Sequence, residues 1–230
     1  MEAIVLAGGF GTRLRSVVSD VPKPMAPVAG RPFLELLLVS LKARGITRVI
    51  LSVGYMYDVI TSYFDEHPIG IDLAYEIEST PLGTGGAMRA ALRRITGEFA
   101  LVFNGDTYLD LDIRELAVMW PGDRTPIVVA RRVEDAERYG KLEVHESRVV
   151  RFMGSGSRGA GVINAGCYLV PNNVLADARL PAAFSFEQDF LARSPTSSFR
   201  AFITSGHFID IGVPEDYARA QSELAAFARP

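Results

Sequence analysis

The first thirteen residues constrain the fold more than any other stretch of the chain. An apolar run from Ala3 to Ala7 predicts a buried parallel strand, which stops at Gly8-Gly9, with Gly11 two residues later. Glycines at such a turn let a ligand come close to the backbone, and several N–H groups can then point at one anion. Arg13 adds a planar set of donors that suits phosphate oxygens. We therefore expect a phosphate-binding loop after the first strand of an α/β fold.

Two well-known nucleotide motifs are absent. The pattern G-x-x-x-x-G-K-[ST] does not occur, and Gly9-Phe10-Gly11 lacks the third glycine of a dinucleotide fingerprint. The missing glycine disfavours a nicotinamide dehydrogenase, since no obvious acid or base marks a second site either. A tight turn with solvated cations is the simpler interpretation of glycines alone. Lys23, between Pro22 and Pro24, makes the combination more specific and favours phosphate binding.

Composition places the chain among ordinary globular proteins. Of its 230 residues, 48% are hydrophobic and 22% are charged, which suits one α/β domain. A net charge of −3 gives no overall basic field, so we expect no nucleic-acid partner. The single cysteine, Cys167, excludes an internal disulfide and fits a reducing compartment, where its apolar neighbours indicate an inert core thiol. No apolar run approaches the roughly 20 residues of a membrane helix and no signal peptide is visible, so we expect a cytoplasmic protein without membrane contact.

The first half alternates apolar strands with helices. Strands are expected at 3–7, 49–53, 71–77 and 99–103. Helices are expected over 32–44, over 58–64 and, after the segment from Pro81 to Ala87, to about Arg94. This order predicts a Rossmann-like, three-layer α/β fold with a mostly parallel sheet covered on both faces.

The alternation of strands and helices stops in the second half, where turn residues separate short expected strands. Strands are expected at 127–131, 141–145, 148–152 and 162–170, with an extended piece at 208–212. Ser185 is expected to cap a helix through Leu191, and Pro214 to open a last helix over 215–227. We expect this half to form a mixed α+β layer over the mouth of the first sheet.

Two aspartates stand where chemistry is expected. Asp106 follows a buried strand directly, and ligands of parallel sheets lie beyond the carboxyl ends of the strands. A turn aspartate that caps the next element is the common alternative. Asp210 lies between Ile209 and Ile211, where a charge needs a partner or a metal. Together with a phosphate-binding loop, the two carboxylates suggest Mg²⁺, although spacing alone does not show that they meet.

Five motifs occur in one order and together resemble the signature of sugar-1-phosphate nucleotidyltransferases. They are Leu6-Ala7-Gly8-Gly9-Phe10-Gly11-Thr12-Arg13 with Pro22-Lys23-Pro24, then Pro81-Leu82-Gly83-Thr84-Gly85-Gly86-Ala87, Asn104-Gly105-Asp106, Asn164-Ala165-Gly166 and Phe208-Ile209-Asp210-Ile211-Gly212. The likeness covers nearly the whole chain. Within the family, the chain is most similar to D-glycero-α-D-manno-heptose 1-phosphate guanylyltransferases. This closer likeness rests on Tyr75-Glu76-Ile77-Glu78, Arg138-Tyr139-Gly140, Phe184-Ser185-Phe186-Glu187 and the run from Ile209 to Tyr217.

The resemblance implies a reaction in which a nucleoside triphosphate and a sugar 1-phosphate give a nucleotide sugar and pyrophosphate. Arg13 would bind the β and γ phosphates, Lys23 the α-phosphate and the sugar phosphate, and Asp106 with Asp210 would hold Mg²⁺ or Mn²⁺. The implied nucleotide-binding residues are Leu6, Ala7, Gly8, Gly9, Gly11, Thr12, Glu78, Pro81, Gly83 and Thr84.

Base preference rests on Glu78, which stands where thymidylyl relatives carry a glutamine. Guanine presents two donors on one edge, N1–H and the 2-amino group, and a carboxylate accepts from both. We therefore expect GTP, with Glu78 reading the base and Gly83 letting the backbone approach it; UTP and CTP are the alternatives. The plainer interpretation of Glu78 is a surface charge at a strand end.

One departure from the family concerns the sugar phosphate. Relatives carry Phe-x-Glu-Lys where this chain has Phe152-Met153-Gly154-Ser155, so both charged groups are missing. Lys141 or Arg158 is expected to replace the lysine. By motif position the expected sugar-phosphate residues are Gly140, Lys141, Asn164 and Glu187. The expected product is GDP-heptose for a capsule or other surface polysaccharide, with mannose 1-phosphate as the alternative substrate.

The resemblance also sets expectations about organisation. Residues 1–230 would form one nucleotidyltransferase domain, with a nucleotide-binding half over 1–110 and a sugar-phosphate-binding half over 111–230. Since the sequence stops soon after the last motif, we expect no C-terminal left-handed β-helix of the kind that some relatives carry. A homodimer is expected by analogy only. A non-catalytic, regulatory homologue is disfavoured because Arg13, Lys23, Asp106 and Asp210 are all present.

Overall fold

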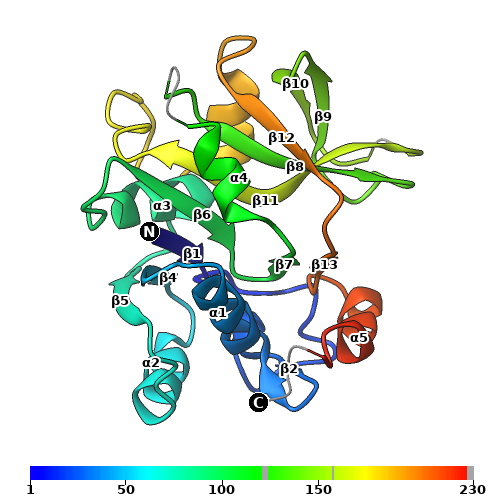
Figure 1. The fold of residues 1–230 in the computed structure, drawn as a ribbon. Coiled ribbons are helices and arrows are strands. Elements are labelled where there is room, and N and C mark those ends of the chain that lie inside the picture. Colours follow the sequence, from blue (N-terminus) through cyan, green and yellow to red (C-terminus); the bar gives the residue numbers. More distant parts are fainter. Residues whose placement is uncertain (121–123, 157, 227–230) are drawn as a thin grey trace.

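A nine-stranded sheet runs through the centre of the computed structural model, which describes residues 1–120, 124–156 and 158–226 (Figure 1). Its strands, in chain order, are β1 (Glu2–Leu6), β4 (Arg48–Val53), β5 (Asp72–Ile77), β6 (Phe99–Asn104), β8 (Ile127–Val133), β9 (Lys141–His145), β10 (Arg148–Met153), β11 (Gly161–Pro171) and β12 (Arg200–Thr204). Across the sheet the order is β5-β4-β1-β6-β11-β8-β12-β10-β9.

The first half forms the expected parallel, three-layer part. β1 pairs in parallel with β4 and β6, and β4 pairs in parallel with β5. Helices α1 (Phe33–Ala43) and α2 (Tyr57–Glu66) pack on one face, where α1 contributes Leu37 to a core that includes Val5. Helix α3 (Gly83–Leu92) packs on the other face, where Met88 joins a core that includes Ile4. Neighbouring residues of β1 thus point to opposite faces, as the strand period requires, and both faces are apolar.

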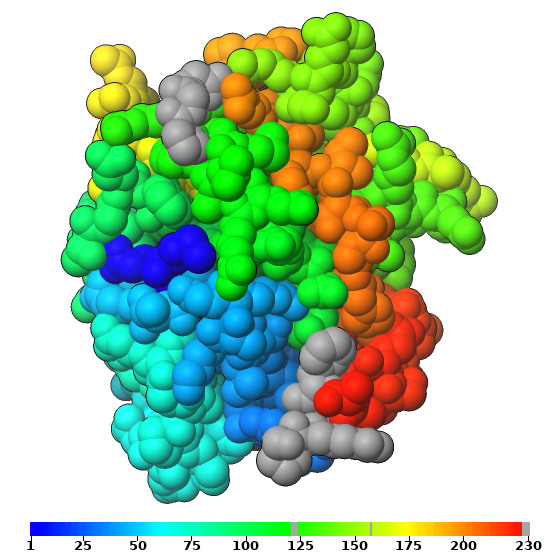
Figure 2. Space-filling view, in the orientation of Figure 1, coloured from blue at the N-terminus to red at the C-terminus, as the bar shows by residue number. Residues whose placement is uncertain are grey.

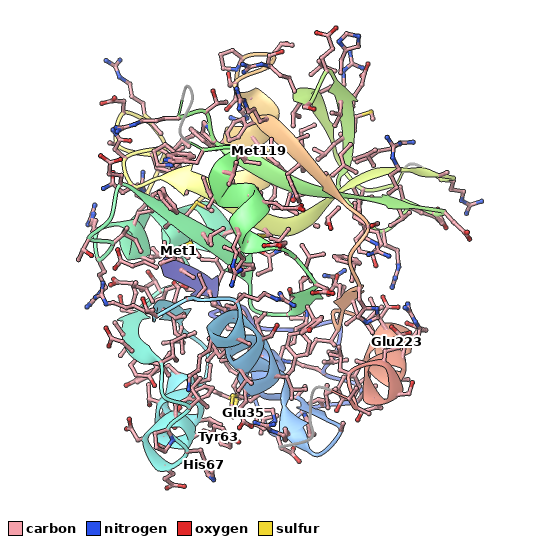
Figure 3. The ribbon with its side chains drawn as sticks, viewed as in Figure 1. Met1, Glu35, Tyr63, His67, Met119 and Glu223 are labelled. Atoms are coloured by element: carbon pink, nitrogen blue, oxygen red, sulfur yellow. The ribbon has the colours of Figure 1, made fainter. Side chains whose placement is uncertain are left out.

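A buried polar contact fixes α2 against α1. The hydroxyl of Tyr63 donates to Glu35 Oε2 at 2.8 Å, and Arg31 donates to Glu35 Oε1 at 2.7 Å (Figure 3). Burial and the carboxylate of Glu35 raise the pKa of Tyr63 to about 12. The contact therefore keeps its proton on the tyrosine and its charge on the glutamate over the physiological pH range.

The second half departs from the expected arrangement, because most of it continues the same sheet instead of covering the mouth of the first. β11 pairs antiparallel with both β6 and β8, so it joins the two halves. β8 pairs in parallel with β12, and β9 and β10 form an antiparallel pair at the far edge. The thiol of Cys167, on β11, is buried in this junction, and burial raises its pKa, as expected for a core thiol.

The last part of the chain returns to the first half. β13 (Phe208–Asp210) pairs antiparallel with β7 (Thr107–Leu109), and α5 (Pro214–Glu223) packs against residues that include Leu14 and Phe33. In Figure 2, α5, in red, lies in the lower part of the view, where the lighter blue and cyan segments of the first half also lie. α5 begins at Pro214, as predicted, and ends earlier than expected; Phe227, the expected end, lies outside the described residues.

Several other elements differ from the sequence expectations. Ser185 accepts a hydrogen bond from the N–H of Gln188, which confirms the predicted cap, but the turn that it caps is the π-helical η2 (Phe186–Phe190), followed by the 3₁₀ turn η3 (Leu191–Arg193). The elements that sequence patterns did not predict are η1 (Lys23–Met25), β2 (Pro27–Val28), β3 (Arg31–Pro32), α4 (Ile113–Val118), β7 and β12. Within the described residues, every helix falls short of the length and apolarity needed to traverse a bilayer.

Candidate active site

Three loops at the carboxyl ends of β1, β5 and β6 surround a cavity of about 410 Å³. The loop after β1 contains the glycines, the loop after β5 leads into α3, and β6 ends at Asn104 just before Asp106. The predicted site residues in the cavity wall are Leu6, Ala7, Gly8, Gly9, Gly11, Thr12, Arg13, Lys23, Glu78, Pro81, Gly83, Thr84 and Asp106. The fold therefore brings every predicted nucleotide-binding residue to one opening at the end of the parallel strands.

Lys23 and Asp106 lie in the wall of this cavity, and Asp210 lies next to them without lining it. The ammonium of Lys23 forms an ion pair with Asp106. The β7–β13 ladder pairs Asp210 with Thr107, and the N–H of Ile211 donates to the carbonyl oxygen of Asp106 at 3.0 Å. The two aspartates are thus neighbours across a short antiparallel ribbon, although half of the chain separates them in sequence.

The two carboxyl groups titrate in opposite directions. Burial alone would raise the pKa of Asp106, but Lys23 holds it below its ordinary value. Burial and the negative charge of Asp106 raise the pKa of Asp210 to about 6. The N–H of Gly212 donates to Asp210 Oδ1 at 2.7 Å and favours the ionised form in part. The pair is therefore short of positive charge, even with Lys23 beside it.

The donor set suits a hard divalent cation that shares its ligands with a substrate. Carboxylate oxygens are preferred by Mg²⁺, which is commonly held by one or two carboxylates together with phosphate oxygens and water. Among the described residues, no three histidine, cysteine, aspartate or glutamate side chains gather into a metal site. Two neighbouring carboxylates at this cavity fit an ion that binds together with phosphates, and they do not form an all-protein cage.

The loop after β1 wraps tightly around Lys23. Gly11 has a φ of +59°, and a Cβ at this position would lie 2.6 Å from the Cβ of Lys23. Only glycine meets both requirements without strain. Thr12 and Arg13 follow on the exposed side of the loop, and Arg13 is close enough to Asp106 and Asp210 to lower the pKa of both. The loop therefore presents backbone amides and a guanidinium to the same opening.

Glu78 lies in the cavity wall with both carboxylate oxygens engaged. Oε1 accepts from the hydroxyl of Ser52 at 3.2 Å, and Oε2 accepts from the N–H of Leu82 at 3.0 Å. Gly83, which follows Leu82, has a φ of +67°, and a Cβ there would lie 2.6 Å from the carbonyl oxygen of Phe184. In this structure the requirement for glycine at this position therefore comes from the backbone turn and from its packing on Phe184.

The predicted sugar-phosphate residues form a second group, which is outside the wall of the cavity. The carbonyl of Gly140 accepts from the N–H of Asn164 at 2.8 Å, and Lys141 pairs with Ile163 across β9 and β11. The Lys141 ammonium donates to the carbonyl of Ala160. The other candidate cation, Arg158, is 84% exposed and pairs with Glu137.

A chain of hydrogen bonds links the second group to the cavity. Asn164 Nδ2 donates to the hydroxyl of Tyr168 at 2.6 Å, and this hydroxyl donates to Glu187 Oε1 at 3.0 Å. Glu187 Oε2 accepts from Thr84, in the cavity wall, at 2.7 Å and from Ser185 at 3.1 Å. Burial and the charge of Glu187 raise the pKa of Tyr168 well above its ordinary value, so the hydroxyl stays a donor.

Two further residues belong to the site. Asn104 lies in the cavity wall, and its buried side-chain oxygen has no hydrogen-bond partner among the residues that the structure describes. Its place in Asn104-Gly105-Asp106 was a signal that could have marked it. Ser52 was also missed, because a serine inside a buried strand carries no pattern that indicates a site.

The chain resembles known proteins over nearly its whole length. The chain matches the family described as nucleotidyl transferase over residues 2–226. It is 43% identical over 226 residues to the D-glycero-α-D-manno-heptose 1-phosphate guanylyltransferase of Aneurinibacillus thermoaerophilus, covering 97% of this chain and 98% of that protein. It is also 43% identical over 219 residues to the protein of the same name from Campylobacter jejuni, covering 94% and 97%.

A solved structure gives the same fold. The crystal structure of HddC from Yersinia pseudotuberculosis matches with a TM-score of 0.89 and 38% identity, covering 97% of this chain and 99% of that one. The same protein complexed with GMP-PN matches with a TM-score of 0.88. The chain belongs to the nucleotidyl transferase family, and its Rossmann-like α/β fold with a mixed sheet is the fold of that family's sugar-phosphate members.

The raised pKa of Asp210 predicts a pH-dependent effect on stability. An unfolded aspartate has a pKa of about 3.9, so the folded chain binds more protons than the unfolded chain between about pH 4 and pH 6. Ionisation of Asp210 therefore lowers stability as pH rises through this window. We expect Asp210→Asn to raise Tm at pH 7.5 in EDTA, with a smaller gain at pH 4, as measured by calorimetry.

A matched control for this measurement is Asp110→Asn, since Asp110 is an exposed carboxylate paired with Arg44. This variant should show no gain in Tm at pH 7.5. An Asp210→Asn protein that is less stable than wild type at pH 7.5, or that gains as much at pH 4, would contradict the assignment.

The buried hydroxyl of Tyr168 predicts a measurable loss when it is removed. Tyr168→Phe leaves Asn164 Nδ2 and Glu187 Oε1 without this partner in the interior, which costs about 1–2 kcal/mol in the free energy of unfolding. Urea unfolding followed by circular dichroism measures the loss. Tyr57→Phe, at an exposed position, is the control and should be neutral. Equal stability of the two variants would contradict the linking role of Tyr168.

Proposed function

We propose that the chain transfers GMP from GTP to D-glycero-α-D-manno-heptose 1-phosphate, giving GDP-heptose and pyrophosphate, for capsule or other surface polysaccharide synthesis. The observation that carries the proposal is the meeting of Lys23, Asp106 and Asp210 beside a loop of exposed amides and Arg13. Two D-glycero-α-D-manno-heptose 1-phosphate guanylyltransferases are each 43% identical to this chain over nearly its full length, which supports the choice of heptose as the sugar and guanine as the base. A cytoplasmic location and a homodimer remain predictions.

The proposed chemistry is one in-line displacement. An oxygen of the sugar phosphate attacks the α-phosphorus of GTP, the bond from this phosphorus to the bridging oxygen breaks, and pyrophosphate leaves with that electron pair. Lys23 would bind the α-phosphate and the incoming sugar phosphate, whose negative charges otherwise repel each other. Arg13 would bind the β and γ phosphates and stabilise the leaving pyrophosphate. Catalysis of this kind depends on positioning and on charge, without a covalent enzyme intermediate.

A divalent cation, Mg²⁺ or Mn²⁺, is part of the proposal. Asp106 and Asp210 would hold it, and it would neutralise charge on the phosphates that they face. The deficit of positive charge at these two carboxylates supports the assignment, since burial and Asp106 already raise the pKa of Asp210. The amides of Gly8, Gly9 and Gly11, in the wall of the same cavity, would bind the nucleotide.

The proposed base reader is Glu78. Its carboxylate lies in the cavity wall, and each oxygen already accepts one hydrogen bond, which leaves further acceptor capacity on each. Guanine would donate to these oxygens through N1–H and its 2-amino group. A uracil or thymine edge presents acceptors on both sides of its N–H, so the same carboxylate would repel it.

The sugar phosphate is proposed to lie near Asn164, Gly140, Lys141 and Glu187. Support comes from the hydrogen bonds that join Asn164 and Glu187 to Thr84 in the cavity wall. Lys141 is the favoured replacement for the lysine that relatives carry after Phe-x-Glu, because Arg158 is mostly exposed and pairs with Glu137. Lys141 is also the only member of this group that would bring a positive charge to the phosphate.

A substrate screen tests the proposal directly. The purified protein is incubated with GTP, ATP, UTP or CTP and with heptose, mannose or glucose 1-phosphate in the presence of Mg²⁺, and pyrophosphate release is measured. We expect the highest kcat/KM for GTP with D-glycero-α-D-manno-heptose 1-phosphate. A preference for UTP or CTP would overturn the base assignment, and a preference for mannose 1-phosphate the sugar assignment. Nucleotide binding without pyrophosphate release would indicate a non-catalytic homologue.

Substitutions test the proposed roles of the charged residues. Asp106→Asn should lower turnover by about 100-fold or more, with the fold intact by circular dichroism, because a ligand of the cation is weakened.

Lys23→Ala should lower kcat far more than it raises the KM for GTP, since its charge acts mainly on the transition state. Asp110→Asn, a control outside the cavity, should keep wild-type turnover. An Asp106→Asn protein with full activity would refute the metal-binding role.

A further inference from the structure

A buried serine lies directly behind the proposed base reader. Ser52 is on β4, between β1 and β5, and its side chain is completely buried. Its hydroxyl donates to Glu78 Oε1 at 3.2 Å. Ser52 is one of only four buried polar or charged residues among the described part of the chain, together with Glu35, Thr107 and Asp216. A hydroxyl at such a position needs a partner, and Glu78 is the partner that the fold supplies.

The other carboxylate oxygen of Glu78 is fixed from a different element. Its Oε2 accepts from the N–H of Leu82 at 3.0 Å, and Leu82 is the capping residue at the start of α3. The backbone N–H of Glu78 donates to Val53 at 2.8 Å, which anchors the residue to the end of β4. The partial positive charge at the N-terminus of α3 favours a carboxylate there. The plane of the Glu78 carboxylate is thus set by one hydrogen bond on each oxygen.

Bare backbone forms the surface against which this carboxylate lies. A Cβ at Gly8 would be 2.4 Å from Glu78 Oε1 and 3.3 Å from the backbone nitrogen of Gly54. The rigid neighbours are therefore a carboxylate that is already hydrogen-bonded and a backbone atom. A side chain at residue 8 would displace Glu78 from Ser52, so glycine is required there by close approach.

We propose that Ser52 is the residue that positions Glu78 for guanine recognition. The inference rests on the proposed role of Glu78 and adds how its carboxylate is oriented. A free glutamate samples several rotamers, and ordering it when the nucleotide binds would reduce affinity. Ser52 and the Leu82 N–H remove that cost in advance, because they fix both oxygens on the side away from the ligand. The remaining acceptor capacity of each oxygen is then directed to a base with two adjacent donors.

This arrangement specifies the class of nucleotide. Guanine offers N1–H and a 2-amino group side by side, hypoxanthine offers N1–H alone, and adenine offers an acceptor at N1. A carboxylate held in one plane distinguishes guanine from hypoxanthine by the one hydrogen bond that the 2-amino group donates. The ratio of kcat/KM for GTP to kcat/KM for ITP therefore measures whether both oxygens are in register with the base.

The test is a double-mutant cycle read by this ratio. Ser52→Ala, Glu78→Gln and the double variant are assayed with GTP and with ITP at saturating sugar 1-phosphate, taking the sugar that the substrate screen identifies. We expect Ser52→Ala to raise the KM for GTP about tenfold, an effect of about 1.4 kcal/mol, and to lower the GTP/ITP ratio severalfold. The kcat with GTP and the KM for the sugar phosphate should stay as in wild type. In the Glu78→Gln background, Ser52→Ala should change the ratio less than about twofold, because coupled residues are not additive.

The outcomes separate this inference from the proposed function. If Glu78→Gln keeps the wild-type GTP/ITP ratio, Glu78 does not read the base, and the proposed recognition fails together with the inference. If Glu78→Gln lowers the GTP/ITP ratio while Ser52→Ala keeps the wild-type ratio, only the positioning role of Ser52 is overturned. A Ser52→Ala effect of equal size with and without Glu78 would overturn it as well.

A control addresses general effects of removing a hydrogen-bonded hydroxyl, and the half-buried Ser194 supplies it. Ser194 donates to the carbonyl of Phe190 at 2.7 Å and lies outside the cavity wall. Ser194→Ala should keep the KM for GTP and the GTP/ITP ratio of wild type. A purely structural role for Ser52 would lower Tm and kcat without moving the ratio, and that result would also contradict the inference.

Discussion

The ion pair of Lys23 with Asp106, next to Asp210, is the interaction on which the site depends. It joins the loop after β1, the end of β6 and the β7–β13 ribbon, which come from distant parts of the chain. Two carboxylates and one ammonium leave the group with a negative charge, and burial makes that charge costly. In the proposed reaction, a divalent ion would offset this charge when the triphosphate binds, together with the nearby Arg13. The glycine loop would then supply the shape of the phosphate site.

Local patterns were sufficient to predict the parallel strands and the main helices of the first half. The apolar runs of β1, β4 and β6 and the apolar face of α1 carry their own periodicity, so their positions shift by only a residue or two in the structure. Gly8 and Gly9 could also be identified from the sequence, since they end the apolar run from Ala3 to Ala7. The nucleotide-binding residues that the family resemblance implied all lie in the wall of one cavity. Local chemistry and global fold agree in this half of the chain.

Long-range pairing explains what the sequence did not reveal. β7 has three residues and exists because β13 pairs with it, and β12 begins with Arg200 and carries no clear alternation. The meeting of Asp106 with Asp210 depends on the same ribbon, so no spacing rule could establish it. In the sequence, Ser52 cannot be distinguished from any other small residue of a buried strand. Only its hydrogen bond to Glu78 suggests that it positions this carboxylate. The sheet order of the second half likewise follows from β11 pairing with β6, which apolar content alone leaves undetermined.

The junction between β6 and β11 limits how the molecule can move. Its register pairs Cys167 with Phe103 and Tyr168 with Val102, in the most buried part of the sheet. Two halves of a chain that share one continuous sheet cannot rotate as rigid bodies unless the shared pairing bends or breaks. We therefore expect adjustment on substrate entry in the segments that leave the sheet, such as the loop after β1.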